Sequence, residues 1–284
     1  MADAPRYCEA ITRIRGSHAD ISKGASQCVK EADMCSSTCS ATAYCLARHR
    51  IKFAIINVRN MDNMEKFGTN MYDRKYSNKD ETSPRSVVTY FVDKYLTQSK
   101  NCLDLGSGAG RHSKYIAEKG IDVTAIDLSE IGVEKTKEAL KDFPNSTVLI
   151  GDIHKLPFEK ESFDSLVCNR VLDYNDDDGL EVAFAEIERI VKSGGLVLLT
   201  VRSISQQPKP EEILMAENSE HAKSFKVADS TQVQHYFTEQ EIQALAKKHN
   251  FDVEEIREDK HINSEGESKA EWQAILRKLE KSKS

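Results

Sequence analysis

The stretch that decides the fold is Asn101-Cys-Leu-Asp-Leu-Gly-Ser-Gly-Ala-Gly-Arg-His-Ser113. It opens with a short apolar run that suits a buried parallel strand, and three glycines follow at every second position, Gly106, Gly108 and Gly110. Glycine admits positive φ angles and lets a ligand approach the backbone, and the helix expected from Arg111 would point free N–H groups at that ligand. The pattern predicts a strand, a tight turn and a helix start that bind a nucleotide-like cofactor.

The spacing of the glycines separates two kinds of nucleotide site. A dinucleotide fingerprint, G-x-G-x-x-G, would need its third glycine at the position of Arg111, so nicotinamide dinucleotides are not expected. The pattern Asp-x-Gly-x-Gly-x-Gly instead resembles motif I of the class I S-adenosylmethionine-dependent methyltransferases. The resemblance implies that S-adenosylmethionine is the cofactor and that its site includes Asp104, Gly106, Ser107, Gly108 and Gly110.

A second acid follows at a suitable distance. After a helix at 111–119 that ends at Gly120, the segment Ile121-Asp-Val-Thr-Ala-Ile-Asp127 alternates in polarity and ends on a carboxylate. A carboxylate at the tip of the second strand, about twenty residues past the first glycine, is placed to accept hydrogen bonds from both ribose hydroxyls. We assign Asp127 to the ribose, with Leu128 beside it. The structural alternative for Asp127 is an acid that stabilises the start of the next helix.

A third acid follows the next expected strand. Residues 147–150 predict a buried strand, and the sequence Gly-Asp-Ile comes directly after it. In the family that the chain resembles, the acid of this stretch holds the adenine amino group, which assigns Asp152 and the backbone of Ile153. We expect His154, the next residue, to be a solvated loop residue.

The fourth strand, expected at 163–170, brings Asn169 and Arg170 to the carboxyl end of the sheet, where open α/β sheets bind ligands. Asn169 is included in the cofactor site. The other expected elements are a helix near 87–95 with Ser83-Pro84 at its start, a helix at 181–192 ended by Gly194-Gly195, a strand at 196–201, a helix from Thr238 with a capping box to Glu241, and strands at 251–256 and 272–276.

Strand-to-helix units in series predict an α/β fold with a right-handed doubly wound sheet. The resemblance covers residues 72–278 and implies a seven-stranded, mostly parallel sheet in the order 3-2-1-4-5-7-6, with the last strand antiparallel and helices on both faces. Within the class, Leu156-Pro-Phe158 and Tyr236-Phe-Thr238 resemble the small-molecule branch that includes the tellurite-resistance-type enzymes and methyltransferase type 11.

Charge and cysteine content change near residue 60. Residues 1–60 contain nine Lys or Arg and five acids, whereas the remainder contains 31 and 41. Five of the seven cysteines lie in the first 45 residues, at spacings that match neither a zinc site nor an iron–sulfur site, so no metal is expected. We expect residues 1–60 to be a poorly ordered or accessory leader, a targeting segment, or sequence translated upstream of the natural start. The methyltransferase domain is expected at 61–284.

The overall composition narrows the partners. A net charge of −6 gives no general attraction to nucleic acid phosphates. No apolar run approaches the roughly eighteen residues that a transmembrane helix needs, and the N-terminus lacks the apolar core of a signal peptide. We therefore expect a soluble cytoplasmic protein with no membrane partner. Binding to nucleic acid is not expected.

The cofactor determines the expected chemistry. A sulfonium-bound methyl group is electrophilic, so the protein has to hold a nucleophile in line with it and exclude water. The Asn-Pro-Pro-Tyr box of amino-group nucleic acid methylases and the Pro-Cys nucleophile of cytosine methylases are both absent, which favours a small-molecule acceptor. Two alternatives stay open: a non-catalytic S-adenosylmethionine-binding scaffold or regulator, and an RNA methyltransferase that uses the arginines of residues 1–60.

The acceptor site is expected at the long connection after the fifth strand. Residues 203–237 exceed a plain connection in a compact sheet, and such length is typical of a lid or substrate loop. No catalytic residue is assigned, but one cavity is expected to be lined by Arg170, Arg202, His235 and Tyr236. Each arginine has the alternative of pairing with Asp173 or another acid, and Tyr236 that of packing before the next helix.

Overall fold

The computed structural model describes residues 82–206, 217–218, 223–226, 233–262 and 266–280. The predictions for residues 1–60, for the domain start at residue 61 and for most of the 203–237 segment lie outside these ranges. Within them, no helix combines the length and the apolar character that would let it cross a membrane.

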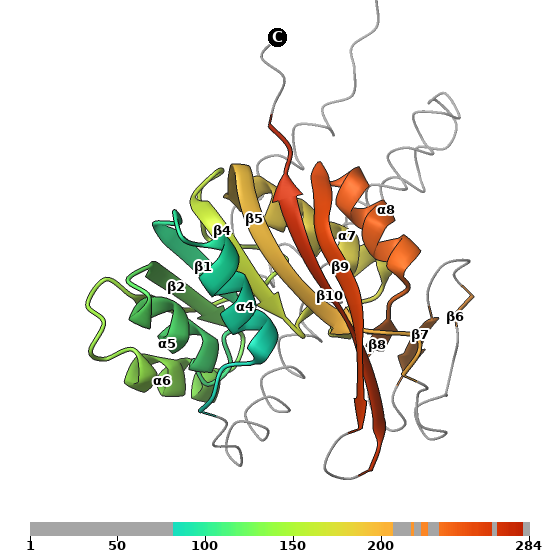
Figure 1. Cartoon of the computed structure of the whole chain (residues 1–284), viewed down its shortest axis with the longest axis horizontal. Helices are drawn as coiled ribbons and strands as arrows, with labels where there is room; N and C mark the ends of the chain where they lie inside the picture. The colour runs from blue at the N-terminus through green and yellow to red at the C-terminus, as the bar shows by residue number, and fades with distance from the viewer. Residues whose placement is uncertain (1–81, 207–216, 219–222, 227–232, 263–265, 281–284) are drawn as a thin grey trace, which may run out of the picture. The chain divides into compact units, whose positions relative to one another are not determined.

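One mixed sheet organises the domain (Figure 1). Its strands lie in the order β3-β2-β1-β4-β5-β10-β9, with β3 to β5 parallel and β10 antiparallel to both of its neighbours. This is the predicted order 3-2-1-4-5-7-6 with its antiparallel last strand, which is confirmed. The strands are β1 (Asn101–Leu105), β2 (Asp122–Asp127), β3 (Thr147–Ile150), β4 (Phe163–Asn169), β5 (Val191–Arg202), β9 (Phe251–Ile262) and β10 (Ser268–Lys278).

A smaller antiparallel sheet follows β5 along the chain, in the order β6-β7-β8. Its strands are β6 (Glu217–Asn218), β7 (Lys223–Lys226) and β8 (Val233–Tyr236). The described parts of the long connection therefore form strands rather than a plain loop. A single bridge from Ser203 to Phe237 brings the two ends of the connection together.

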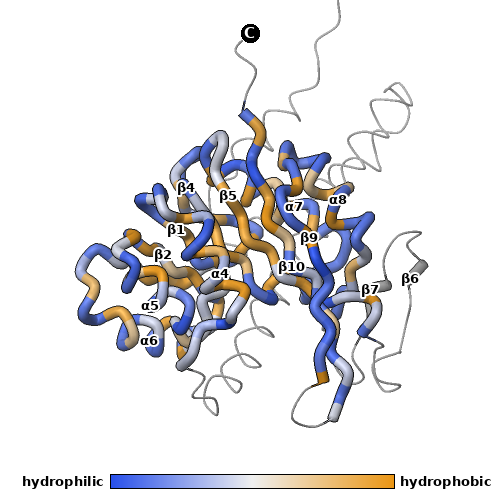
Figure 2. Tube along the Cα trace, viewed as in Figure 1, coloured by the Kyte–Doolittle hydropathy of each residue, from blue (hydrophilic) through white to orange (hydrophobic). Residues whose placement is uncertain are grey.

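Helices cover both faces of the large sheet. They are α4 (Ser86–Tyr95), α5 (Arg111–Glu118), α6 (Glu130–Ala139), α7 (Asp177–Ile190) and α8 (Glu239–Lys248), with a 3-10 turn η1 (Leu172–Tyr174) after β4. One hydrophobic core lies between the sheet and α7 and α8, and a second lies between the sheet and α4 and α5. Figure 2 shows the hydrophobic residues gathered along the central strands.

Successive side chains along the central strands point to opposite faces of the sheet, so each strand contributes to both cores. In β4, Leu166 and Cys168 belong to the α7 side and Val167 to the α4 side, and in β1 Cys102 faces the α4 side. Both cysteines are free and fully buried. Burial raises the pKa of the Cys102 thiol to about 12 and also raises that of Cys168.

The structure corrects several predicted boundaries. Helix α7 starts at Asp177, four residues before the predicted start, because the Asp176 side chain caps it by accepting from the Gly179 N–H at 2.9 Å. The chain then enters β5 directly at Val191, so Gly194-Gly195 lies inside the strand and does not end the helix. The cap of α4 is Arg85 and not Ser83.

Strand β3 forms at its predicted residues but is not buried. Its side chains are exposed or half-buried, and Ile150 is 55% exposed, because β3 is the edge strand of the sheet and has a neighbour on one side only. At the opposite edge, β9 and β10 run far beyond the predicted strands 251–256 and 272–276, and their shared hairpin extends past the other strands in Figure 1.

Candidate functional site

The glycine turn lies where the predicted site requires it, between the end of β1 and the start of α5. Gly106, Gly108 and Gly110 have φ angles of 73°, 58° and 81°, a region that favours glycine. The Gly106 and Ser107 amides donate to the Ile126 carbonyl oxygen at 2.8 and 3.1 Å, so the turn is tied to the tip of β2. A Cβ on Gly106 would come within 2.3 Å of the Val171 side chain, and only glycine leaves that space.

Asp127 anchors this turn from the tip of β2. Its Oδ2 accepts from the Gly108 amide at 2.7 Å and its Oδ1 accepts from the Ser129 amide at 2.8 Å. A carboxylate offers about four lone-pair sites, so acceptor capacity remains after two backbone bonds. The carboxylate therefore sits beside the glycine turn, the place that the spacing indicated, and its predicted contact with the ribose stays a prediction. Leu128 beside it is half-buried.

Two buried polar atoms next to the turn lack a hydrogen-bond partner among the described residues. Asp104, 1% exposed, accepts from the Ser113 hydroxyl at 2.5 Å through Oδ2, but its Oδ1 has no partner. Burial raises the pKa of Asp104 to about 6, and the charge of Asp127 adds to this effect. The Nε2 of His112, in the first turn of α5, is also without a partner, and burial lowers the pKa of His112 to about 3.

These observations test whether the residues fit the cofactor that the motif implies. A buried polar atom without a partner is costly unless a ligand satisfies it. The Asp104 Oδ1 could accept from an ammonium group, and the first turn of α5 presents amides to a carboxylate. The donors and acceptors around the glycine turn therefore suit an amino acid moiety, which S-adenosylmethionine carries.

Asp152 and His154 form a partly buried pair after β3. The Asp152 Oδ1 accepts from the His154 backbone N–H at 2.9 Å and lies 2.6 Å from its Nδ1, while the His154 Nε2 lies 2.6 Å from the Asn175 Oδ1. The expectation of a solvated His154 is wrong, because its side chain is only 9% exposed. Burial alone would lower the pKa of His154, but the hydrogen bond and charge of Asp152 outweigh it and raise that pKa. Ile153 packs against the core on the α7 side.

Asn169 ends β4 next to the tip of β5. Its Oδ1 accepts from the Thr200 hydroxyl at 2.9 Å and from the Arg85 Nη1 at 3.1 Å. Arg85 is the cap residue of α4, so the tips of β4 and β5 are joined to the first described helix. Asn169 lies at the carboxyl end of the sheet, as predicted, and its role toward the cofactor stays a prediction.

Two of the four proposed acceptor residues contact one buried acid, Asp173, and a third, Tyr236, lies beside Arg202. Arg170 donates from Nε to the Asp173 Oδ2 at 2.6 Å, and the backbone N–H of Arg202 donates to the Asp173 Oδ1 at 2.7 Å. The Arg202 guanidinium carbon lies 5.9 Å from the centre of the Tyr236 ring, and Tyr236 is 1% exposed. The alternative of an arginine paired with Asp173 is thus realised, and the cluster stands at the tips of β4 and β5.

His235 points elsewhere. Its fully buried ring lies 2.7 Å from the Glu241 Oε1 through Nε2 and 3.9 Å from the Asp177 Oδ1 through Nδ1. Asp177 is the first residue of α7 and Glu241 lies in the first turn of α8, so this side chain joins β8 to the two helix starts. The three residues bring one potential metal-ligand atom each within 4.8 Å of one another. The His235 side chain therefore points toward Glu241 and Asp177 and not toward the other three acceptor candidates.

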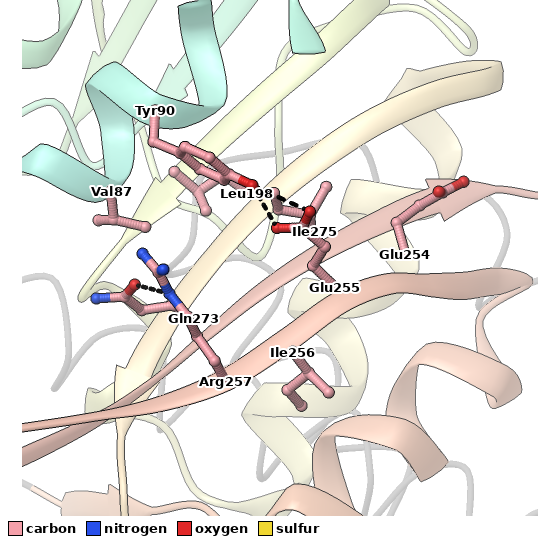
Figure 3. Close-up of a pocket in the computed structure, with 9 residues that line it drawn as sticks. All are labelled: Val87, Tyr90, Leu198, Glu254, Glu255, Ile256, Arg257, Gln273 and Ile275. Atoms are coloured by element: carbon pink, nitrogen blue, oxygen red, sulfur yellow. Dashed lines mark hydrogen bonds between the residues drawn. The ribbon is translucent and has the colours of Figure 1, made fainter. Parts of the chain in front are cut away.

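A separate pocket of about 370 Å³ lies on the α4 face of the sheet (Figure 3). Tyr90 of α4 and Arg257 of β9 face each other across it, and Arg257 donates to Gln273 of β10 at 2.9 Å. Its other lining residues include Val87, Leu198, Glu255 and Ile275. None of the predicted site residues lines this pocket.

Sequence reasoning missed Arg85, Glu271, Ser113 and the role of His154. Arg85 donates from Nη2 to the Glu271 Oε1 at 2.6 Å across 186 residues of sequence, and no local pattern connects these two. Ser113 lies within the quoted stretch, where a hydroxyl one helical turn into α5 could have suggested a partner for Asp104. His154 follows Asp152 by two residues, a spacing that allows a local side-chain pair.

Comparisons with known proteins agree with this geometry. A family model described as a methyltransferase domain matches residues 103–199. The chain is 33% identical over 146 residues to a malonyl-[acyl-carrier protein] O-methyltransferase of Salmonella typhimurium, covering 49% of this chain and 56% of that protein. It is 35% identical over 98 residues to the protein of the same name in Hamiltonella defensa, covering 34% and 36%. The chain thus spans about half, or less, of the length of these curated relatives.

Solved structures share the fold. A methyltransferase from Methanosarcina mazei gives a TM-score of 0.59 at 20% identity and covers 70% of this chain and 100% of its own. The 1,6-didemethyltoxoflavin-N1-methyltransferase of Burkholderia thailandensis, solved with its substrate and S-adenosylhomocysteine, gives 0.62 at 17% identity and covers 78% and 90%. Residues 103–199 thus match a methyltransferase domain, and the sheet that contains them has the strand order of the class I S-adenosylmethionine-dependent methyltransferase fold.

Proposed function

We propose that this protein transfers the methyl group of S-adenosylmethionine to a small-molecule acceptor. The observation that carries the proposal is the glycine turn, pinned to Asp127 and flanked by the unpartnered Asp104 Oδ1, at the carboxyl edge of a methyltransferase sheet. The relatives that match this domain include a malonyl-[acyl-carrier protein] O-methyltransferase. A protein with the same fold is a 1,6-didemethyltoxoflavin-N1-methyltransferase. The groups that these names give as acceptors are small, which supports a small acceptor here.

Each proposed cofactor contact uses a polar group beside the glycine turn or at a strand tip. The N-terminus of α5 would face the amino acid carboxylate, and Asp104 would accept from its ammonium group. Asp127 would accept from the ribose hydroxyls. Asp152 would accept from the adenine amino group through Oδ2, since its Oδ1 already receives both contacts from His154.

The residues beyond the cofactor position the acceptor. When bound, S-adenosylmethionine supplies an electrophilic methyl group on a sulfonium ion, so the protein gains rate mainly by orientation and by exclusion of water. The tips of β4 and β5, with Asn169 and the arginines that follow, form the edge to which the acceptor would bind. The bridge between Ser203 and Phe237 places the ends of the long connection at that edge.

A two-part experiment tests the proposal. Calorimetric titration with S-adenosylhomocysteine should show binding, and incubation with methyl-labelled cofactor and a panel of thiols, amines, carboxylates and RNA should show transfer to a small molecule. Binding without transfer to any acceptor would favour a scaffold or regulator. Salt-dependent transfer to RNA would favour the RNA methyltransferase alternative.

A further inference from the structure

A chain of alternating charges crosses the acceptor edge. Arg85 pairs with the Glu271 Oε1 at 2.6 Å, and Arg170 pairs with the Glu271 Oε2 at 3.3 Å. Arg170 also pairs with the Asp173 Oδ2 at 2.6 Å, and the Arg202 Nε lies 3.8 Å from the same oxygen. The cluster therefore contains three guanidinium groups and two carboxylates, which leaves one excess positive charge.

The acids lie beneath the arginines. The side chain of Asp173 is 0% exposed and that of Glu271 is 2% exposed, whereas those of Arg85, Arg170 and Arg202 are 26%, 28% and 16% exposed. A molecule that approaches from solvent therefore meets guanidinium groups first. Arginine forks bind carboxylates through paired N–H donors, and partial burial strengthens such pairs relative to exposed ones.

The two arginines nearest the strand tips are held in unusual settings. Arg170 adopts a φ of 61°, which non-glycine residues rarely do, while its backbone N–H donates to the Thr200 carbonyl oxygen at 3.0 Å. The Arg202 guanidinium lies over the Tyr174 ring at 5.5 Å and the Tyr236 ring at 5.9 Å. Its Nε is buried and makes no hydrogen bond among the described residues. Both guanidinium groups are thus oriented before any acceptor arrives.

We propose that the acceptor carries a carboxylate, that Arg170 and Arg202 bind it, and that this carboxylate is the group methylated. The inference rests on the proposed function. In the step, a carboxylate oxygen forms the new O–C bond, and the C–S bond breaks with its electron pair on sulfur. The products are a methyl ester and S-adenosylhomocysteine. No proton moves, so no general base is required, and the second carboxylate oxygen remains for the guanidinium groups.

The test compares acids with their neutral amides. The acids are malonyl-N-acetylcysteamine, hexanoate, benzoate and indole-3-acetate, each incubated with methyl-labelled cofactor beside its amide. At least one acid should yield a labelled product that releases methanol in mild alkali, as a methyl ester does, and no amide should. Arg170→Gln and Arg202→Gln should each raise the KM for that acid at least tenfold and leave the affinity for S-adenosylhomocysteine within about twofold.

A matched control removes the same charge elsewhere. Arg277 lies at the other end of β10 from Glu271, where it pairs with Glu254, so Arg277→Gln should leave the KM unchanged. Arg202→Lys retains the positive charge but lacks the planar guanidinium group, so its affinity for the acid should lie between those of the parent and Arg202→Gln. Thermal unfolding of each variant shows whether it still folds.

Binding measurements separate this inference from the proposed function. The same acids and amides are titrated into the protein with and without S-adenosylhomocysteine. If S-adenosylhomocysteine does not bind, the proposed function fails. The arginine site would still be supported if the protein binds the acids more tightly than the amides and if this preference is weaker in both glutamine variants. Equal binding of acids and amides, a preference unchanged in the variants, or label in an alkali-stable product would each overturn the inference.

Discussion

The two halves of the carboxyl edge are built in different ways. In the proposed cofactor half, at the tips of β1 to β3, the polar groups bond to near neighbours in sequence, such as Ser129 with Asp127 two residues apart and Ser113 with Asp104 nine apart. In the proposed acceptor half, at the tips of β4 and β5, Arg170 pairs locally with Asp173, but its second acidic partner, Glu271, is 101 residues away. The first half is therefore encoded in short motifs, and the second is complete only after the sheet has formed.

The largest expected effect comes from the centre of the acceptor half. Asp173→Ala removes a fully buried carboxylate and leaves Arg170 with Glu271 as its single acidic partner among the described residues. Breaking a buried ion pair on one side costs about 3–5 kcal/mol, which lowers the unfolding midpoint by roughly 10 °C in a domain of this size. Calorimetric unfolding measures the change, with the exposed Asp259→Ala as control. A midpoint within about 1 °C of the parent would show that the acceptor half does not depend on this pair.

The second-largest effect on stability is expected at Gly106, where the two halves meet. An alanine at Gly106 would put its Cβ 2.3 Å from the Val171 Cγ2 in a backbone conformation with φ of 73°. We expect Gly106→Ala to lose roughly 2–4 kcal/mol of unfolding free energy through crowding and backbone strain. Gly120→Ala is the matched control, because its φ is 80° and nothing lies within 4 Å, so it should lose only about 1 kcal/mol. Equal losses in denaturant titrations would mean that the contact with Val171 carries no cost.

Asp127 tests the cofactor half directly. Asp127→Ala removes a carboxylate that holds two backbone amides and, in our proposal, the ribose, so affinity for S-adenosylhomocysteine should fall by about 1.5–3 kcal/mol, or roughly 10- to 150-fold. Titration calorimetry measures the change. Asp122→Ala, at the exposed start of the same strand, serves as control. An unchanged dissociation constant in Asp127→Ala would remove the ribose assignment.

The smallest effect depends on pH. The pKa of His154 is raised above its ordinary 6.5, so the stability from its pair with Asp152 is fully present below pH 6.5 and is lost as pH rises through the raised value. His154→Gln should therefore be less stable than the parent by about 1 kcal/mol at pH 6 and by less at pH 9. Unfolding midpoints across that range measure the difference, with the exposed His261→Gln as control. A difference that grows with pH would contradict the assignment.

The sequence predicted the parts of the molecule that local chemistry determines. The glycine spacing and the acids after β1 to β3 indicated the family, and the family implied the strand order that the structure confirms. The start of α7 was missed because the run Asn175-Asp-Asp-Asp178 offers several possible caps, of which Asp176 is the one used. Gly194-Gly195 resembled a helix end because glycine with positive φ is common there, whereas Gly194 takes φ of 77° inside β5. The link from these arginines to Glu271 was beyond prediction, since sheet pairing alone brings Glu271 opposite Arg202.

Alkylation of the two buried cysteines, Cys102 and Cys168, can measure how the sheet opens. Thiolates are the species that alkylating reagents attack, and neither Cys102 nor Cys168 is exposed or readily ionised. In the native chain, labelling of either thiol therefore requires the sheet to open. Because one of these thiols lies on each side of the sheet, mass spectrometry after a reagent pulse would show whether the two helical layers separate together or in sequence.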